Sequence, residues 1–232
     1  MLVRLMFLLN RVKNSLDPIN ILNINFIRRV ITNRAAVLDY GAGRSQYQPV
    51  ITDLGAKYFV YEPNREYDND ERIEFFHCTK GQKVVLLLDV IQHVENVDRI
   101  LSDVTEHMTG STTLIITYPF LFPICENNDF QRWSRAGISH LLERHSLEIV
   151  CRSYRGGIFS CIIELVRMYF INSKPLQAKG WFQERRSFKW FLRGFIEAFF
   201  LIPRFVCFKL DSVIPDNGVY IGEILEVRKK SK

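Results

Sequence analysis

The sequence predicts an α/β protein built on a doubly wound, mostly parallel sheet of seven strands. Three features predict this fold: short apolar runs, helical patterns between those runs, and a glycine-rich turn after the first run. Nearly continuous apolar runs are typical of strands buried on both faces of a parallel sheet. Their alternation with helices indicates βαβ units, so we expect a Rossmann-like sheet with helices on both faces.

The predicted strands follow the apolar runs along the chain. Five are rich in β-branched or aromatic residues, and we expect them at 35–40, 57–61, 73–76, 84–88 and 112–117. Two further segments alternate more between apolar and polar residues, as antiparallel edge strands do, and we expect these at 147–152 and 220–228. Helical patterns occupy residues 46–54, 92–108 and 134–145.

Changes of pattern divide the chain into four segments. We expect a helical extension over 1–34, an α/β core over 35–166, a basic aromatic helical insertion over 167–212, and the closing strand with a basic tail over 213–232. The extension ends in a basic cluster, which suits a helix C-terminus. Residues 172–180 are a polar linker, and Pro203 is expected to end or kink the helix predicted over 187–210.

Composition limits the class of protein. The 232 residues are 47% hydrophobic, which argues against wholesale disorder. Five cysteines without a CxxC spacing argue against a disulfide framework and against a zinc ribbon, and no metal site is predicted. Scattered thiols fit a reducing compartment, so we expect a cytoplasmic protein. The apolar N-terminal stretch lacks a small-residue cleavage site and is interpreted as a helix, and no run is long enough to span a membrane.

The basic charge is concentrated in the last third of the chain. The net charge is +6, yet residues 1–166 carry 18 basic and 19 acidic side chains, whereas 167–232 carry 13 and 6. Within the aromatic segment 187–210, Lys189, Arg193 and Glu197 are spaced as a narrow charged stripe on an otherwise apolar helix. The segment has three interpretations: a lid or dimer contact, a helix at the inner face of an anionic membrane, or a nucleic-acid surface. Its apolar density argues against nucleic acid.

The turn after the first strand is the most informative segment. Residues 37–45 place Asp39, Gly41 and Gly43 between a buried strand and a helix. Glycine permits positive φ and close approach of a ligand, and the helix start offers unpaired N–H groups. In dinucleotide-binding folds this arrangement holds a pyrophosphate. Ser45 stands where a third glycine is usual, so a plain strand-to-helix turn is the competing interpretation.

Two further signals follow at the ends of later strands. Glu62 ends the second strand 19 residues after Gly43, and an acidic residue at that spacing can accept hydrogen bonds from ribose hydroxyls. His93 follows the strand 84–88, near the edge where open α/β sheets bind ligands. An exposed loop glutamate and a histidine that packs on its helix are the competing interpretations.

These segments together resemble the class I S-adenosylmethionine-dependent methyltransferases. The resemblance rests on Asp39-x-Gly41-x-Gly43, on Glu62, and on LLDVIQHVENVDRIL followed by TLIITYPF. The stretch PFLFPICENNDFQRWSRAGISHLL is similar to type 11-like bacterial members encoded with surface-polysaccharide genes, and VIPDNGVYIGEILEVRKK to their closing strand. The resemblance covers about residues 35–155.

The resemblance implies a set of cofactor-binding residues. Asp39, Gly41 and Gly43 would line the methionine portion of S-adenosylmethionine, Glu62 would hold the ribose, and Asp89 and Val90 would lie beside the cofactor. The neighbouring positions Ala42 and Pro63 complete the expected set.

Two departures from the family pattern affect the expected chemistry. The third strand usually ends in an aspartate that meets the adenine, but the sequence there is Phe-His-Cys-Thr at 76–79. The family's histidine before a glutamate is Cys125 beside Glu126, so His93 or Glu126 would have to serve as the base. Asp129 and Arg132 are retained. Arg132 would either orient an acceptor or form a salt bridge that fixes the loop.

The predicted function is therefore methyl transfer to a sugar hydroxyl of a polysaccharide or lipid-linked glycan, with peripheral membrane contact and a homodimer as further expectations. One rival is a nicotinamide-dependent enzyme, whose glycine fingerprint would normally be complete. The other is a catalytically degenerate protein that keeps the fold and binds a partner or a membrane.

Overall fold

The computed structural model describes residues 16–62, 71–78, 81–124, 128–171, 186–214 and 218–230, with side chains from 192 onward in the fifth range. The chain separates into two compact units. The helical unit comprises Met1–Ile21, Leu121–Pro123 and Arg155–Ile221. The sheet unit comprises Leu22–Phe120, Ile124–Tyr154 and Gly222–Lys232.

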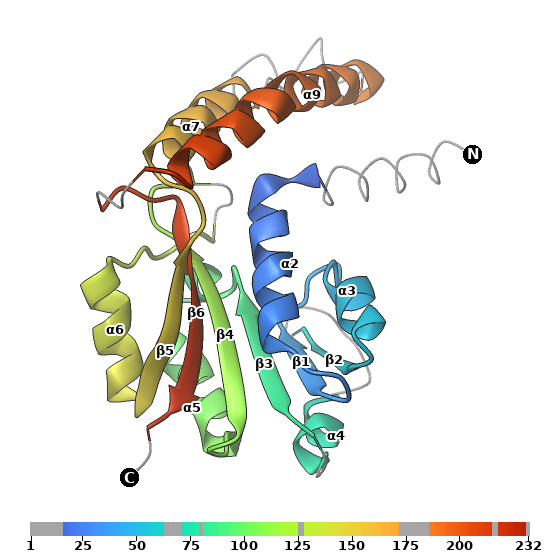
Figure 1. Ribbon diagram of the computed structural model, residues 1–232, viewed down its shortest axis with the longest axis vertical. Coiled ribbons are helices and arrows are strands. Elements are labelled where there is room, and N and C mark those ends of the chain that lie inside the picture. The colour runs from blue at the N-terminus through green and yellow to red at the C-terminus, as the bar shows by residue number, and fades with distance from the viewer. Residues whose placement is uncertain are drawn as a thin grey trace. The chain divides into compact units, whose positions relative to one another are not determined.

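The sheet unit is built on a mixed, mostly parallel sheet in the order β2-β1-β3-β4-β6-β5 (Figure 1). Strands β1 to β4 are parallel, and β6 is antiparallel to both of its neighbours. The strands are β1 (Ala36–Tyr40), β2 (Lys57–Tyr61), β3 (Lys83–Leu88), β4 (Thr112–Pro119), β5 (Leu147–Tyr154) and β6 (Gly222–Lys229). The α/β architecture predicted from the apolar runs is confirmed.

The strand predicted at 73–76 is wrong, and the sheet has six strands among the described residues rather than seven. These residues lie in helix α4 (Glu71–His77). Glu71 and Glu74 occupy its first turn, where acidic side chains stabilise a helix, and Phe75 is its fully buried side chain. The expected loss of an acidic residue at the end of a third strand therefore has no basis, because 76–78 do not follow a strand.

The placement of the last strand also differs from the prediction. The segment at 220–228 was expected as an edge strand, but β6 lies between β4 and β5. Leu225 pairs with Ile116 on one side and with Arg152 on the other. Paired on both sides, β6 is an interior strand, and β5 forms the edge of the sheet.

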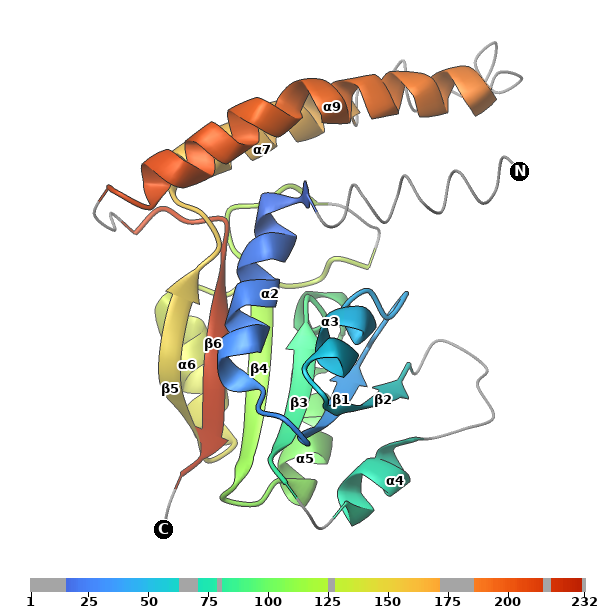
Figure 2. The ribbon, with the colours of Figure 1, turned by 45° about the vertical axis from the view of Figure 1, so that its right-hand side comes forward.

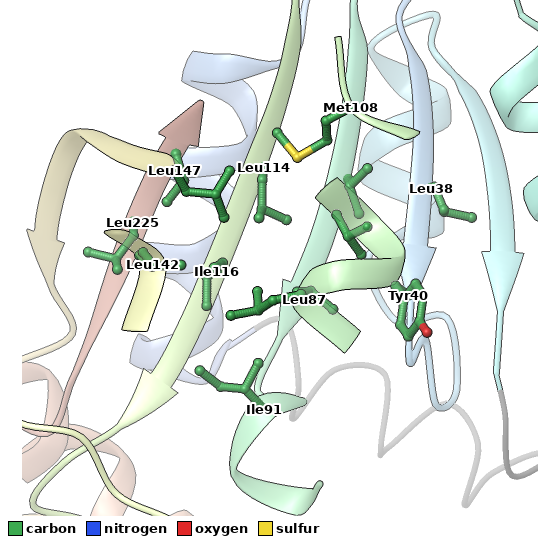
Figure 3. Packing of buried hydrophobic residues seen from close by; sticks show 14 of the residues in the cluster. Leu38, Tyr40, Leu87, Ile91, Met108, Leu114, Ile116, Leu142, Leu147 and Leu225 are labelled. Atoms are coloured by element: carbon green, nitrogen blue, oxygen red, sulfur yellow. The ribbon is translucent and has the colours of Figure 1, made fainter. Parts of the chain in front are cut away.

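Alternate side chains of the strands enter two apolar clusters, one on each face of the sheet. On one face Leu38 of β1 packs in the cluster that includes Phe75 of α4 and Leu142 of α6. On the other face Val37 packs with Ile27 and Ile51. Figure 3 shows the first cluster from close by, and Figure 2 shows the helices on either side of the sheet. The helices are α2 (Pro18–Val30), α3 (Gln48–Asp53), α5 (Val97–His107) and α6 (Arg135–Arg144).

Local capping explains where these helices begin. The helix predicted over 92–108 is divided, because Val94 is extended and Asn96 starts α5 by accepting a hydrogen bond from the Arg99 N–H at 3.0 Å. The short 3₁₀ helix η1 (Ile91–His93) precedes this break. Ser134 caps α6 through the Gly137 N–H at 3.2 Å. The predictions at 46–54 and 134–145 are confirmed by α3 and α6.

The helical unit contains α7 (Ile158–Ile171) and α9 (Arg186–Asp211), which pack against each other. The Asp211 carboxylate at the end of α9 accepts hydrogen bonds from the N–H groups of Gly157, Phe159 and Ser160 at the start of α7. Pro203 does not end the predicted helix, because α9 continues to Asp211, with a bend along its length visible in Figure 2. The linker 172–180 and the first fifteen residues of the predicted extension lie outside the described residues.

Across the part of the chain that the structure describes, no helix combines the length and the apolar character needed to cross a bilayer.

Gly222 is expected to be essential for the pairing of β6 with β4. A Cβ atom at this position would lie 2.3 Å from the Tyr118 carbonyl oxygen, which is backbone and cannot turn aside. Gly222→Ala should therefore lower the free energy of unfolding by about 1–3 kcal/mol, as overpacking does. Urea denaturation measures this change. Gly110→Ala is the matched control, because a Cβ atom there meets nothing within 4 Å. Equal stability of the two variants would contradict the assigned contact.

Candidate functional site

The turn after β1 has the backbone conformation that its glycines predict. Gly41 has a φ of +79° and Gly43 a φ of +54°. The Gly41 N–H donates to the Tyr61 carbonyl oxygen at 2.7 Å, which joins the turn to the end of β2. A Cβ atom on Gly41 would lie 2.7 Å from a methyl carbon of Val90, so the missing side chain lets the segment after β3 approach the turn. A Cβ atom on Gly43 would meet nothing within 4 Å.

Glu62 reaches over this turn from the end of β2. Its carboxylate accepts a hydrogen bond from the Gly43 N–H at 2.9 Å. The spacing of 19 residues noted in the sequence therefore corresponds to direct contact between the acidic residue and the glycine turn. Ala42, between the two glycines, is buried. Pro63, also predicted for this site, lies outside the described residues.

Asp39 is a buried carboxyl group directly before the turn. It is 3% exposed and accepts a hydrogen bond from the Tyr58 hydroxyl at 2.6 Å. Burial raises the pKa of Asp39 to about 6; the Tyr58 hydrogen bond opposes this shift, and the nearby Glu62 carboxylate adds to it. A cation beside Asp39 would stabilise its charged form.

Asp89 and Val90 follow β3 in a constrained turn. Asp89 has a φ of +54°, a conformation in which aspartate is enriched among non-glycine residues. Its N–H donates to the Thr117 hydroxyl at 2.8 Å, and its carbonyl oxygen accepts from the Gln92 side chain at 2.9 Å. The bond to Thr117 holds the end of β3 beside the end of β4, and the bond from Gln92 closes the turn after β3. The predicted residues Asp39, Glu62 and Asp89 thus lie at or just beyond the carboxyl ends of three adjacent parallel strands.

His93 lies in η1, at the same edge of the sheet. Its Nδ1 is 3.2 Å from the Asn128 carbonyl oxygen. The segment that begins at Asn128 packs along η1, because the Phe130 N–H donates to the Gln92 carbonyl oxygen at 2.8 Å and the Gln131 side chain donates to Val94 at 2.7 Å. His93 is thereby held between the end of β3 and this loop.

Asp129 and Arg132 form an ion pair within the loop. Arg132 donates two hydrogen bonds to the Asp129 carboxylate, one of them at 2.6 Å, and the Asp129 side chain is only 3% exposed. Of the two roles considered for Arg132, the geometry supports the one in which it fixes the loop. Glu126, the other candidate base, and Cys125 beside it lie outside the described residues.

A buried polar cluster at the ends of β4 and β6 was missed from the sequence. Glu223 is fully buried and accepts hydrogen bonds from the Tyr118 hydroxyl and from Arg152. Arg135 lies 3.4 Å from the other carboxylate oxygen. Tyr58 and Thr117, which orient Asp39 and Asp89, were also missed. The sequence carries no local signal for these residues, because each acts through a partner on another strand.

Comparisons with known proteins identify the fold. No family model matches the chain, and no curated protein matches its sequence. The solved structure of the [4+2]-cyclase SpnF matches with a TM-score of 0.54 at 9% identity, over 92% of this chain and 82% of that one. Coclaurine N-methyltransferase, bound to N-methylheliamine and SAH, matches with a TM-score of 0.50 at 12% identity, over 90% and 73%. A SAM-dependent methyltransferase from Archaeoglobus fulgidus matches with a TM-score of 0.47 at 16% identity, over 90% and 93%.

The first two likenesses support a Rossmann-like methyltransferase fold for this chain. At these identities they concern the fold alone. One of the two proteins is named as a cyclase and the other as a methyltransferase, so the fold by itself does not determine the reaction.

Burial of Asp39 predicts a specific dependence of stability on pH. The pKa of Asp39 is raised to about 6 in the folded protein, so folding favours the protonated form of this carboxyl group. The resulting contribution to the free energy of unfolding is complete below the ordinary pKa of aspartate and is lost as the pH rises through 6. The loss corresponds to about 3 kcal/mol. Asp39→Asn keeps an acceptor for Tyr58 and cannot ionise. Its free energy of unfolding relative to the wild type should therefore rise between pH 4 and pH 7, as measured by urea denaturation. A difference that does not change with pH would refute the burial effect.

Proposed function

We propose that this chain binds S-adenosylmethionine at the carboxyl ends of β1, β2 and β3 and transfers its methyl group to an acceptor. The observation that carries the proposal is the contact between the Glu62 carboxylate and the Gly43 N–H, directly after the buried carboxyl group of Asp39. A glycine turn with an acidic side chain over it fits a ligand that contains a ribose.

The residues present fit this cofactor chemically. S-adenosylmethionine carries an ammonium group, a sulfonium group and two ribose hydroxyls, and carboxylates are suitable partners for all of them. Asp39, Glu62 and Asp89 supply three carboxyl groups at neighbouring strand ends. The space next to Gly43, which a Cβ atom would enter without contact, provides room for a ligand at the turn.

Each residue then has a defined task. Glu62 accepts hydrogen bonds from the ribose, and Asp39 stabilises the positively charged methionine portion. Asp89 and Val90 flank the cofactor, with the Asp89 backbone held by Thr117. When bound, the cofactor supplies an electrophilic methyl group. The chain must align the acceptor with that methyl group and remove a proton from the acceptor.

His93 is the proposed base for that proton. If Nδ1 carries the ring proton and donates a hydrogen bond to the Asn128 carbonyl oxygen, Nε2 has no proton and can accept one from the acceptor hydroxyl. The Asp129–Arg132 pair would act as a positioning pair, since it fixes the loop that contacts His93. We propose a sugar hydroxyl of a polysaccharide or lipid-linked glycan as the acceptor, on the basis of the sequence resemblance over 119–142.

A cofactor titration tests the central claim. Calorimetric titration of the whole chain with S-adenosylmethionine and with S-adenosylhomocysteine should show micromolar binding, whereas NADH should not bind. Gly43→Asn should lower the affinity for both ligands by at least about tenfold, because the asparagine side chain fills the open space at the turn. Asparagine tolerates positive φ, so the turn itself should keep its conformation.

Gly218→Asn is the matched control for that variant. Gly218 has a φ of +79° and a Cβ atom there would also meet nothing within 4 Å. The affinity of Gly218→Asn for S-adenosylmethionine should equal that of the wild type. Absence of wild-type binding, or an equal loss in both variants, would refute the assigned site. Cofactor binding without methyl transfer to any glycan acceptor would instead favour a catalytically degenerate protein.

The pH dependence of binding tests the role of Asp39. Only the ionised carboxylate attracts the positive charges of S-adenosylmethionine, so affinity should fall as the pH is lowered through 6. Asp39→Asn should bind more weakly at pH 8 and show a smaller pH dependence. S-adenosylhomocysteine, which lacks the sulfonium charge, is the control ligand, and its affinity should change less with pH. A wild-type affinity that is constant from pH 5 to pH 8 would contradict this role.

A further inference from the structure

The two helices of the helical unit carry their charged and apolar side chains in an unusual arrangement. Helix α7 has two charged residues, Glu164 and Arg167, and both are buried. The most exposed positions of the same helix are apolar, and Tyr169 is 74% exposed. A helix in contact with water shows the opposite distribution, with charged residues outside and apolar residues inside.

The buried charges form an ionic cluster between α7 and α9. Glu164 accepts hydrogen bonds from Arg167, at 2.8 Å, and from Arg204 of α9. Arg167 also donates to Glu197 of α9 at 2.9 Å, and Arg204 donates to Asp17 at 2.9 Å. Every member of the cluster is therefore paired within the helical unit, so these charges do not need water.

Exposed apolar side chains lie on the faces turned away from this cluster. On α9 they recur with helical spacing at Phe195, Phe199, Ile202 and Val206, whereas Glu197, Phe200 and Arg204 face α7. On α7 the spacing of Ile162, Val166 and Tyr169 places them opposite Glu164 and Arg167.

The exposed charged side chains that the structure describes on α7 and α9 are basic. Arg193 and Lys209 are the exposed charged residues among the described side chains of α9. Asp211 and Glu197, the acidic residues of the same stretch, are engaged with the start of α7 and with Arg167. A helix pair that exposes both cations and apolar or aromatic side chains complements an anionic membrane surface.

We propose that α7 and α9 form a membrane-binding hairpin that inserts into the interface of an anionic bilayer. In apolar surroundings charged side chains must face inward and pair with one another, and this is the arrangement of Glu164, Arg167, Glu197 and Arg204. Because apolar side chains lie on the outer faces of both helices, both helices contact lipid. We place the hairpin within the interface, where apolar side chains enter the lipid boundary and basic side chains meet the head groups.

Co-sedimentation of the full chain with vesicles tests this proposal. The wild type should bind vesicles of phosphatidylcholine containing about one quarter phosphatidylglycerol, and should bind pure phosphatidylcholine vesicles at least about tenfold more weakly. Phe199→Asp on α9 and Tyr169→Asp on α7 should each lower the partition coefficient on anionic vesicles by about tenfold or more.

Val150→Asp is the matched control. Val150 is an apolar residue of β5 in the sheet unit, and it is 50% exposed, comparable to the hairpin residues. This variant should bind vesicles like the wild type. All three substitutions are at exposed positions, so the unfolding midpoint measured by circular dichroism should stay within a few degrees of the wild type.

Several outcomes would overturn the proposal. The first is a wild type that does not bind anionic vesicles, and the second is equal loss of binding in Val150→Asp. Loss in Phe199→Asp alone would restrict the contact to one helix. A dimer in light scattering that Phe199→Asp and Tyr169→Asp dissociate, without vesicle binding, would assign the apolar faces to a second copy of the chain. None of these results bears on cofactor affinity, so this proposal and the proposed function can fail separately.

Discussion

Parallel pairing of β1 with β2 and with β3 is the constraint on which the candidate site depends. Ala36 pairs with Lys57 on one side and with Lys83 on the other, so the three strands run in register. Both faces of β1 are buried, and a shift by one residue would exchange the side chains of the two apolar clusters. The register therefore fixes which residues end the strands together, and these are the acidic residues of the site.

Three buried carboxyl groups illustrate how the chain handles charge in its interior. Glu164 and Glu223 are each paired with arginines, which compensate the charge where it is buried. The partner described for Asp39 is the hydroxyl of Tyr58, which carries no charge. Burial accordingly raises the pKa of Asp39. A buried carboxyl group whose partner is neutral is well suited to receive a cationic ligand, and this distinguishes Asp39 from the two structural carboxylates.

Most of the fold and the centre of the site could be predicted from the sequence, because their signals are local. Residue type and spacing identify the glycine turn and Glu62. Strands β1 to β4 are recognisable as apolar runs, although a fifth run, at 73–76, predicts a strand where the structure has helix α4. That segment failed because four apolar or acidic residues fit a strand and a helical turn equally well. The interior position of β6, the Tyr58 contact and the Glu223 cluster depend on which strands become neighbours, and no local pattern contains that information.

The charged stripe on α9 shows how the same limit applies to a surface. Lys189, Arg193 and Glu197 form one row by spacing alone, and a helix considered by itself would turn such a row toward water. The Glu197 carboxylate instead accepts a hydrogen bond from Arg167, thirty positions earlier in the sequence. Once a partner helix satisfies the charged side chains, they no longer require water, and the apolar side chains on the opposite side of each helix remain exposed. The ionic cluster between α7 and α9 therefore explains why their charged side chains are buried, and it is compatible with apolar outer faces on both helices.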